Sequence, residues 1–66
     1  MDKKAFGHKL RLLRVDRKMN QGELGKAIKV AQKTVSRYET GLMLPSLNKL
    51  EIIAKALKAP MSYFFE

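Results

Sequence analysis

The sequence predicts an all-α fold, a compact bundle of five helices. No stretch alternates apolar and polar side chains with the period of two that marks a strand, whereas apolar side chains recur at spacings of three and four. Glycine and proline are few, and Gly41, Pro45 and Pro60 punctuate these periodic segments. The helices are expected over about residues 3–18, 21–28, 32–39, 47–58 and 61–65. Such short connections favour one unit, so residues 1–66 are expected to form a single domain.

The first expected helix has one apolar face on an otherwise basic surface. Phe6, Leu10 and Leu13 are spaced at i, i+4 and i+7, which places them on one side of a helix. Leu12 and Val15 lie off this stripe, and we expect them to cover a neighbouring element.

The second expected helix begins with a capping signal. Asn20 is the expected N-cap, and Glu23 completes an approximate capping box in which Asn replaces the usual Ser or Thr. Leu24, Ala27 and Ile28 are expected to face the core.

The third expected helix has an apolar back and a polar front. Val35 and Tyr38 are expected to pack inward, and Gly41 is expected to end the segment with a left-handed backbone. The outward side holds Gln32, Lys33, Ser36 and Arg37. Helices of about eight residues are not stable alone in water, so two in succession must be held by others. This arrangement is a helix-turn-helix, which presents one helix to the major groove of DNA.

The last part of the chain is expected to add a longer helix and one short turn. Ser46 is the expected cap of the helix over about 47–58. Its buried stripe is expected to be Leu47, Leu50, Ile53, Ala54 and Leu57. Tyr63, Phe64 and Phe65 give the final turn an apolar side, which suits either the core or an interface with a second copy.

Positive charge is concentrated in the first part of the chain. The 14 Lys and Arg against 6 Asp and Glu give a formal net charge of +8. Residues 1–37 carry eleven basic and three acidic side chains, and residues 38–66 carry three of each. A one-sided basic surface suits a partner rich in phosphates, although it also suits an ordinary solvated surface.

Several classes of function lack the residues that they need. The absence of cysteine excludes disulfides and thiolate metal sites and suits a reducing cytoplasm. There is no Ser-His-Asp set, metal-ligand cluster or glycine-rich phosphate loop, and His8 is a lone histidine on a charged helix. We therefore expect no enzyme activity, no cofactor and no metal site. No apolar run approaches the roughly 20 residues of a membrane span.

The chain resembles the phage repressor and Cro class of helix-turn-helix domains over about residues 5–65. The residues that carry the resemblance are Asn20-Gln21, Gly25, Ile28, Val30, Gln32, Val35, the run Tyr38-Glu39-Thr40-Gly41, Pro45-Ser46, and the spacing of Leu50, Ile53-Ala54 and Leu57. The resemblance implies a bundle of five helices and a sequence-specific regulator of transcription that binds double-stranded DNA. Such a protein is encoded by a bacterium or a phage and lies in the bacterial cytoplasm. When it is bound to DNA, it is associated with the nucleoid.

The resemblance also implies roles for particular residues. The base-reading residues would be Gln32, Lys33, Ser36 and Arg37. The phosphate-binding residues would be Asn20, Gln21 and Thr34. Gln21 would in addition brace Gln32. Arg14 and Glu39 would form a partly buried ion pair between the first helix and the end of the third.

The sequence departs from the pattern of this class at three places. Lys29 stands in the turn where glycine is usual, and a left-handed backbone there costs roughly 1 kcal/mol. The loop over residues 42–44 is uncharged, where the class often carries basic residues. Lys58 replaces another common glycine, and Pro60 stands at the cap of the last turn.

The assembly and the partner leave alternatives open. One copy makes few base contacts, so we expect a homodimer on a palindromic site. The alternative is a protein-interaction module, such as a DNA-binding antitoxin whose aromatic tail, residues 63–65, binds a partner. A basic amphipathic helix over 3–18 also suits anionic lipid, but the ordered helical pattern of the remaining chain argues against this, and we expect no membrane partner.

Overall fold

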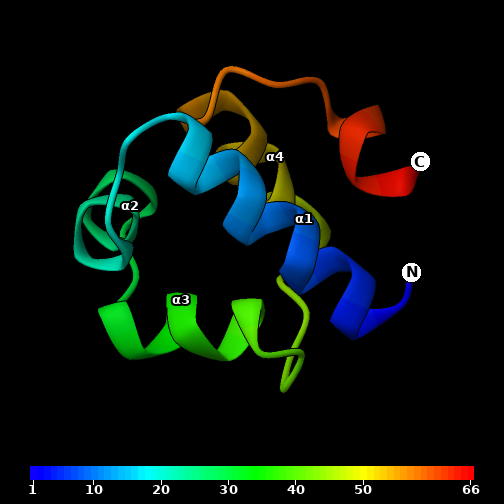
Figure 1. Ribbon diagram of the computed structural model, residues 1–66, viewed down its shortest axis with the longest axis horizontal. Helices are drawn as coiled ribbons and strands as arrows, with labels where there is room; N and C mark the ends of the chain where they lie inside the picture. Colours follow the sequence, from blue (N-terminus) through cyan, green and yellow to red (C-terminus); the bar gives the residue numbers. More distant parts are fainter.

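Four α-helices and one short 3-10 helix surround the core of the protein (Figure 1). The computed structural model describes all 66 residues. The elements in chain order are α1 (Lys3–Asp16), α2 (Gln21–Ile28), α3 (Gln32–Glu39), α4 (Leu47–Ala56) and η1 (Met61–Phe65). The prediction of an all-helical fold without strands is confirmed. Of the five predicted helices four are α-helices, and the last segment, expected as one short turn, takes the 3-10 form common in such short pieces.

Two helices end earlier than the apolar pattern predicts, and in both cases a lysine turns the chain. Lys18 follows α1 with a φ of 59°, and Lys58 follows α4 with a φ of 55°. Lys29 ends α2 in the same left-handed region, at a φ of 62°. The two helices predicted to reach residue 18 and residue 58 therefore stop at Asp16 and Ala56.

The core is built from the apolar stripes of all five elements. Its buried members are Phe6, Leu10, Leu13, Leu24, Ile28, Val35, Tyr38, Leu50, Ile53, Ala54, Leu57 and Phe64. These include the predicted stripe of α1 and the predicted back of α3. The core therefore joins α3 to the other helices by one side only.

Four predicted apolar contacts are not made. Leu47 is 70% exposed because it is the first residue of α4, ahead of the stripe that starts at Leu50. Ala27 is exposed because it lies beside the stripe that Leu24 and Ile28 form on α2. Residues 12 and 15 of α1 are each 54% exposed and cover no neighbouring element.

The helix pair α2–α3 is held by α1 and α4. Helix α1 packs against α3, α4 packs against α2, and η1 packs against both α1 and α4. In Figure 1, α3 runs along the lower edge of the molecule, away from α4 and η1. The packing thus leaves the outer side of α3 uncovered.

Basic side chains bind backbone carbonyls at or near the ends of the helices. These hydrogen bonds join Arg14 Nη1 to Met19 O at 2.7 Å, Lys49 Nζ to Ile28 O at 2.9 Å, Arg17 Nε to Leu57 O at 2.8 Å and Lys9 Nζ to Tyr63 O at 3.1 Å. The last carbonyls of a helix lack partners inside the helix and carry partial negative charge, which a cation compensates. Part of the basic charge of the chain is therefore used inside the fold.

Candidate nucleic-acid interface

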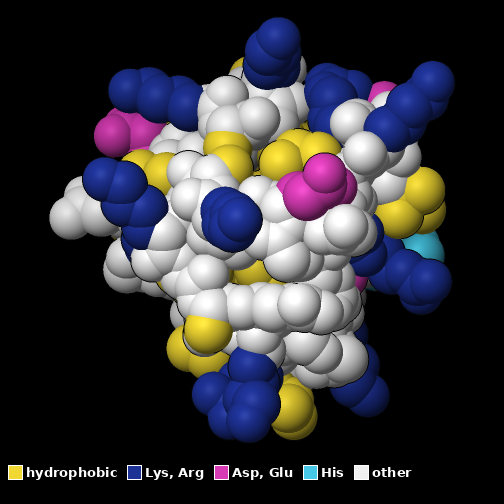
Figure 2. All heavy atoms as spheres, turned by 90° about the vertical axis from the view of Figure 1, so that its left-hand side faces the viewer, with side chains coloured by type: hydrophobic (Ala, Val, Ile, Leu, Met, Phe, Trp, Pro, Cys, Tyr) yellow, Lys and Arg dark blue, Asp and Glu magenta, His cyan; other side chains and the backbone are white.

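Helix α3 presents a polar and basic outer side to solvent. Gln32, Lys33 and Arg37 are exposed, and Ser36 and Thr34 are half-buried. The opposite side is anchored in the core, with Val35 at 0% and Tyr38 at 4% exposure. Burial also raises the pKa of the Tyr38 hydroxyl. Figure 2 shows Lys and Arg side chains on several parts of one face, including the lower edge along which α3 lies.

The start of α2 is fixed by a complete capping box. Asn20 Oδ1 accepts a hydrogen bond from Glu23 N at 2.7 Å, and Glu23 Oε1 accepts one from Asn20 N at 2.8 Å. The predicted cap is confirmed. The box leaves the amide nitrogen of Asn20 free to donate to an outside partner.

The first residue of α2 points its side chain at the end of α3. Gln21 Nε2 donates a hydrogen bond to Glu39 Oε1 at 3.1 Å. The expected brace from Gln21 to Gln32 is wrong, since no hydrogen bond joins these two side chains. A carboxylate is a stronger acceptor than an amide oxygen, which explains why Gln21 is turned to Glu39.

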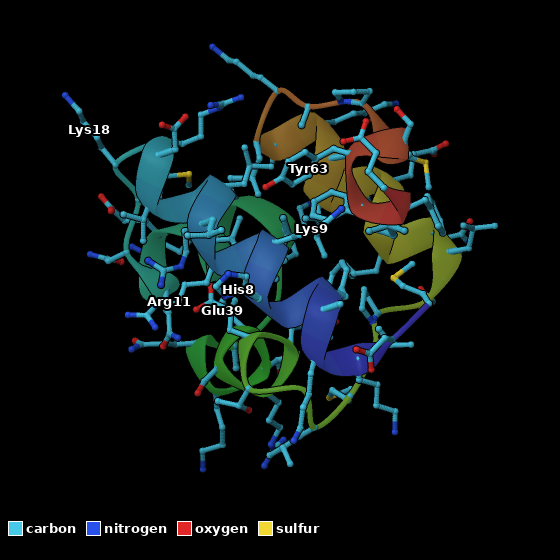
Figure 3. All side chains as sticks on the ribbon, turned by 45° about the vertical axis from the view of Figure 1, so that its right-hand side comes forward. His8, Lys9, Arg11, Lys18, Glu39 and Tyr63 are labelled. Atoms are coloured by element: carbon cyan, nitrogen blue, oxygen red, sulfur yellow. The ribbon has the colours of Figure 1, made fainter.

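A buried ion pair ties α1 to the end of α3. Arg14 Nε and Glu39 Oε2 are 2.6 Å apart, and Arg14 Nη2 donates to Glu39 Oε1 at 3.0 Å. The two side chains are 10% and 3% exposed. The hydrogen bond to Glu39 raises the pKa of Arg14, and burial opposes this in part. Figure 3 shows Glu39 beneath α1. A two-bonded pair has a defined direction, so it fixes the orientation of α3.

Sequence reasoning missed the close approach of α1 to α3 at Gly7. A methyl group at this residue would lie 2.5 Å from Tyr38 O and 2.6 Å from Glu39 O. Only glycine fits here without a shift of the backbone. The available signal was an isolated glycine inside a helical pattern, which usually has a packing reason.

The turn between α2 and α3 has the left-handed residue that the resemblance implies. Lys29 takes this conformation, and Lys49 of α4 holds the carbonyl of Ile28 just before it. Gly25 leaves room for the turn, because a methyl group there would be 2.8 Å from Val30 O. The loop after α3 is exposed and uncharged, with Leu42 at 70% exposure.

The aromatic tail divides between core and surface. Phe64 is 3% exposed, and its ring centroid lies 5.3 Å from that of Phe6. Tyr63 is half-buried and donates to Lys9 O at 3.3 Å, and the Lys9 ammonium lies over its ring, as Figure 3 shows. Phe65 is 59% exposed. Of the two alternatives left open for Phe64, core and interface, its burial fits the core.

The helices of the protein are all too short or too polar to cross a lipid bilayer.

Known proteins share both the sequence pattern and this arrangement. The helix-turn-helix family model matches residues 10–64. The cryptic phage CTXphi transcriptional repressor RstR of Vibrio cholerae is 39% identical over 57 residues, which is 86% of this chain and 51% of that protein. The chain spans about half the length, or less, of the curated relatives it matches, from 42% to 51% for the first two.

Two solved structures share the fold. The restriction-modification controller protein C.AhdI of Aeromonas hydrophila has a TM-score of 0.92 and 28% identity, over 97% of both chains. PlcR of Bacillus thuringiensis, solved in complex with the peptide PapR7 and DNA, has a TM-score of 0.85 and 35% identity, over 100% of this chain and 22% of that one. Because the family model covers most of the chain and the fold agrees, this chain belongs to the helix-turn-helix family.

Proposed function

We propose that this chain is a sequence-specific regulator of transcription that binds double-stranded DNA and reads the major groove with α3. One observation carries the proposal: α3 is anchored in the core by Val35 and Tyr38, while Gln32, Lys33 and Arg37 are exposed on its outer side. A helix with its side chains is about 10–12 Å wide, which fits a major groove of about 12 Å. These residue types also suit base edges, because Gln pairs with adenine and Lys or Arg with guanine.

Similarity to known regulators supports the same function. PlcR, which shares the fold, was solved with DNA, and the phage relative is named as a transcriptional repressor. The basic charge of residues 1–37 supplies affinity for phosphates, and the base edges supply specificity. A regulator of this kind acts in the cytoplasm, which the absence of cysteine suits.

The phosphate contacts proposed here lie at the start of α2 and beside the base-reading residues. Gln21 keeps one amide hydrogen and its oxygen after bonding to Glu39, and Asn20 keeps its amide nitrogen. Thr34 is half-buried at the edge of the outer side of α3. Backbone N–H groups at the start of a helix add to an anion site of this kind.

The base contacts of one copy are few, so the working form proposed here is a homodimer. Two α3 helices about 34 Å apart would read the two halves of a palindromic site. The exposed ring of Phe65 supplies apolar contact area for such an interface. The alternative, a partner gripped by the aromatic tail, is weaker because Phe64 is buried and Tyr63 half-buried within the protomer.

The experiment is selection of bound duplexes from a random pool at near-physiological salt, followed by sequencing. An inverted repeat with half-sites about 10 base pairs apart supports a dimeric reader. Binding that enriches no sequence and vanishes as salt rises overturns base reading.

Two matched variants then separate readout from charge. Arg37→Ala, on the outer side of α3, should cost about 1–3 kcal/mol at one base pair and relax the preference there. Lys55→Ala removes the same charge from an exposed position on α4 and should leave the selected sequence unchanged. Equal effects of the two variants on selected and random DNA contradict the proposal.

A further inference from the structure

The side chain of Gln32 rests against the first turn of α2, at a residue that has no side chain. A methyl group at Gly22 would lie 3.3 Å from Gln32 Oε1 and 3.9 Å from Gln32 Cδ. The shorter distance is tighter than most contacts that a methyl group makes in proteins. The oxygen end of the Gln32 amide is therefore turned to α2, and a side chain at position 22 would disturb it.

The other neighbour of this place would be at an ordinary contact distance. The same methyl group would be 3.4 Å from Asn20 Oδ1, and that oxygen is held by the hydrogen bond from Glu23 N. Gln32 is exposed and has no comparable bond within the protein. A side chain at Gly22 would therefore shift the end of the Gln32 side chain and leave the cap in place.

A glycine at this position has no backbone reason. Gly41 is the one glycine of the chain with a positive φ, so Gly22 is in ordinary helical conformation. In a helix, glycine is less favourable than alanine.

We propose that Gly22 is a specificity-positioning residue, because its missing side chain seats the Gln32 amide against α2 and fixes the orientation in which Gln32 meets a base edge. This rests on the proposed function, since it assumes that Gln32 reads DNA. Gln32 needs such a support in this chain because the amide of Gln21 is bonded to Glu39 instead. A side chain held before binding loses less rotamer freedom on binding, which sharpens the choice between bases.

The test compares four proteins by selection and by titration of single-base variants of the best site: wild type, Gly22→Ala, Gln32→Ala and the double variant. The base pair read by Gln32 is the one whose preference changes in Gln32→Ala. At that base pair, Gly22→Ala should lower the discrimination between bases by roughly three- to tenfold, a part of what a good two-bonded contact supplies. In the Gln32→Ala background, Gly22→Ala should cause no further change.

The controls separate positioning from folding. Ala27→Gly changes helix propensity at an exposed position of α2 that lies off this contact, and its base preferences should equal those of wild type. Gly22→Ser carries the same Cβ and provides a second variant if alanine impairs folding, which thermal melting by circular dichroism shows.

The results distinguish a failure of the role of Gly22 from a failure of the proposed function. Unchanged discrimination in Gly22→Ala and Gly22→Ser, a loss spread evenly over all base pairs, or the same loss without Gln32 overturns the role of Gly22 and leaves the DNA-binding function standing. A wild-type protein that enriches no sequence overturns the proposed function itself, and with it this role.

Discussion

Two ion pairs lie about one turn apart at the C-terminal end of α1. They have the same N–O distance but differ in the exposure of their side chains. Arg14–Glu39 and Arg17–Asp16 both have an N–O distance of 2.6 Å. The first pair is 10% and 3% exposed, whereas the second is 35% and 70% exposed. Exposed pairs contribute roughly 0–1 kcal/mol, because water screens them and two mobile side chains must be ordered. Breaking a buried pair is costly because it leaves a charge alone in the interior.

The pairs also differ in what they hold together. Arg14–Glu39 joins α1 to the end of α3 across 25 residues of sequence, and Gln21 bonds to the same carboxylate. Arg17–Asp16 joins sequence neighbours, and Arg17 contributes to the fold mainly through the carbonyl of Leu57. The orientation of the proposed reading helix therefore depends on burial and connection, and the short distance alone does not indicate it.

The largest effect is expected from removing the buried carboxylate. Glu39→Ala should lower the free energy of unfolding by about 3–5 kcal/mol, because the Arg14 guanidinium stays buried without its partner. Urea unfolding followed by circular dichroism measures the loss.

The control for this variant removes both charges. Arg14→Met/Glu39→Met should lose less stability than Glu39→Ala alone, since no lone charge remains. If the double variant loses as much as or more than the single one, the penalty does not come from the unpaired guanidinium.

A large apolar effect is expected where α1 meets the tail. Phe64→Ala should lower the free energy of unfolding by about 3 kcal/mol, the lower end of the usual range because the end of a chain can partly close the cavity. The matched change Phe65→Ala, at an exposed ring, should stay within about 0.5 kcal/mol of wild type. Similar losses for the two variants would contradict the division of the tail into core and surface.

The sequence predicted the helix-turn-helix better than its flanks for a physical reason. The bounds of α2 and α3 agree with the prediction, because a capping box opens one and a glycine follows the other. The ends of α1 and α4 do not agree, because lysines take the left-handed turns there. Lysine carries no signal for such a backbone, so nothing in the apolar pattern marked these two ends.

Within the candidate site, the residues on the outer side of α3 were easier to predict than the hydrogen-bond partners of the side chains around it. The residues on the outer side of α3 follow from helical spacing, and the resemblance supplied the pair of Arg14 and Glu39. The hydrogen-bond acceptor of Gln21 depends on the three-dimensional position of Glu39, and the spacing of residues in the sequence does not predict that position. The contact of Gly7 with the end of α3 was missed for the same reason.

A smaller effect, and one of opposite sign, is expected in the turn between α2 and α3. Lys29→Gly should raise the free energy of unfolding by about 0.5–1 kcal/mol, because glycine takes a left-handed backbone without the steric cost. The gain is reduced by the conformational entropy that glycine loses on folding. Lys29→Ala removes the same charge but keeps the strain, so it should bring no gain. Urea midpoints of the three proteins decide the point, and a loss of stability in Lys29→Gly refutes strain at this residue.

The smallest effect is expected from the exposed ion pair. Asp16→Ala should change the free energy of unfolding by less than about 0.5 kcal/mol, although its N–O distance equals that of the buried pair. The same urea experiment should be repeated in 0.5 M salt, where screening reduces even this difference. Asp16 is 70% exposed, and Arg17 keeps its bond to Leu57 O when the carboxylate is gone. A loss comparable to that of Glu39→Ala would mean that contact distance, and not burial, sets the contribution of a charge pair in this fold.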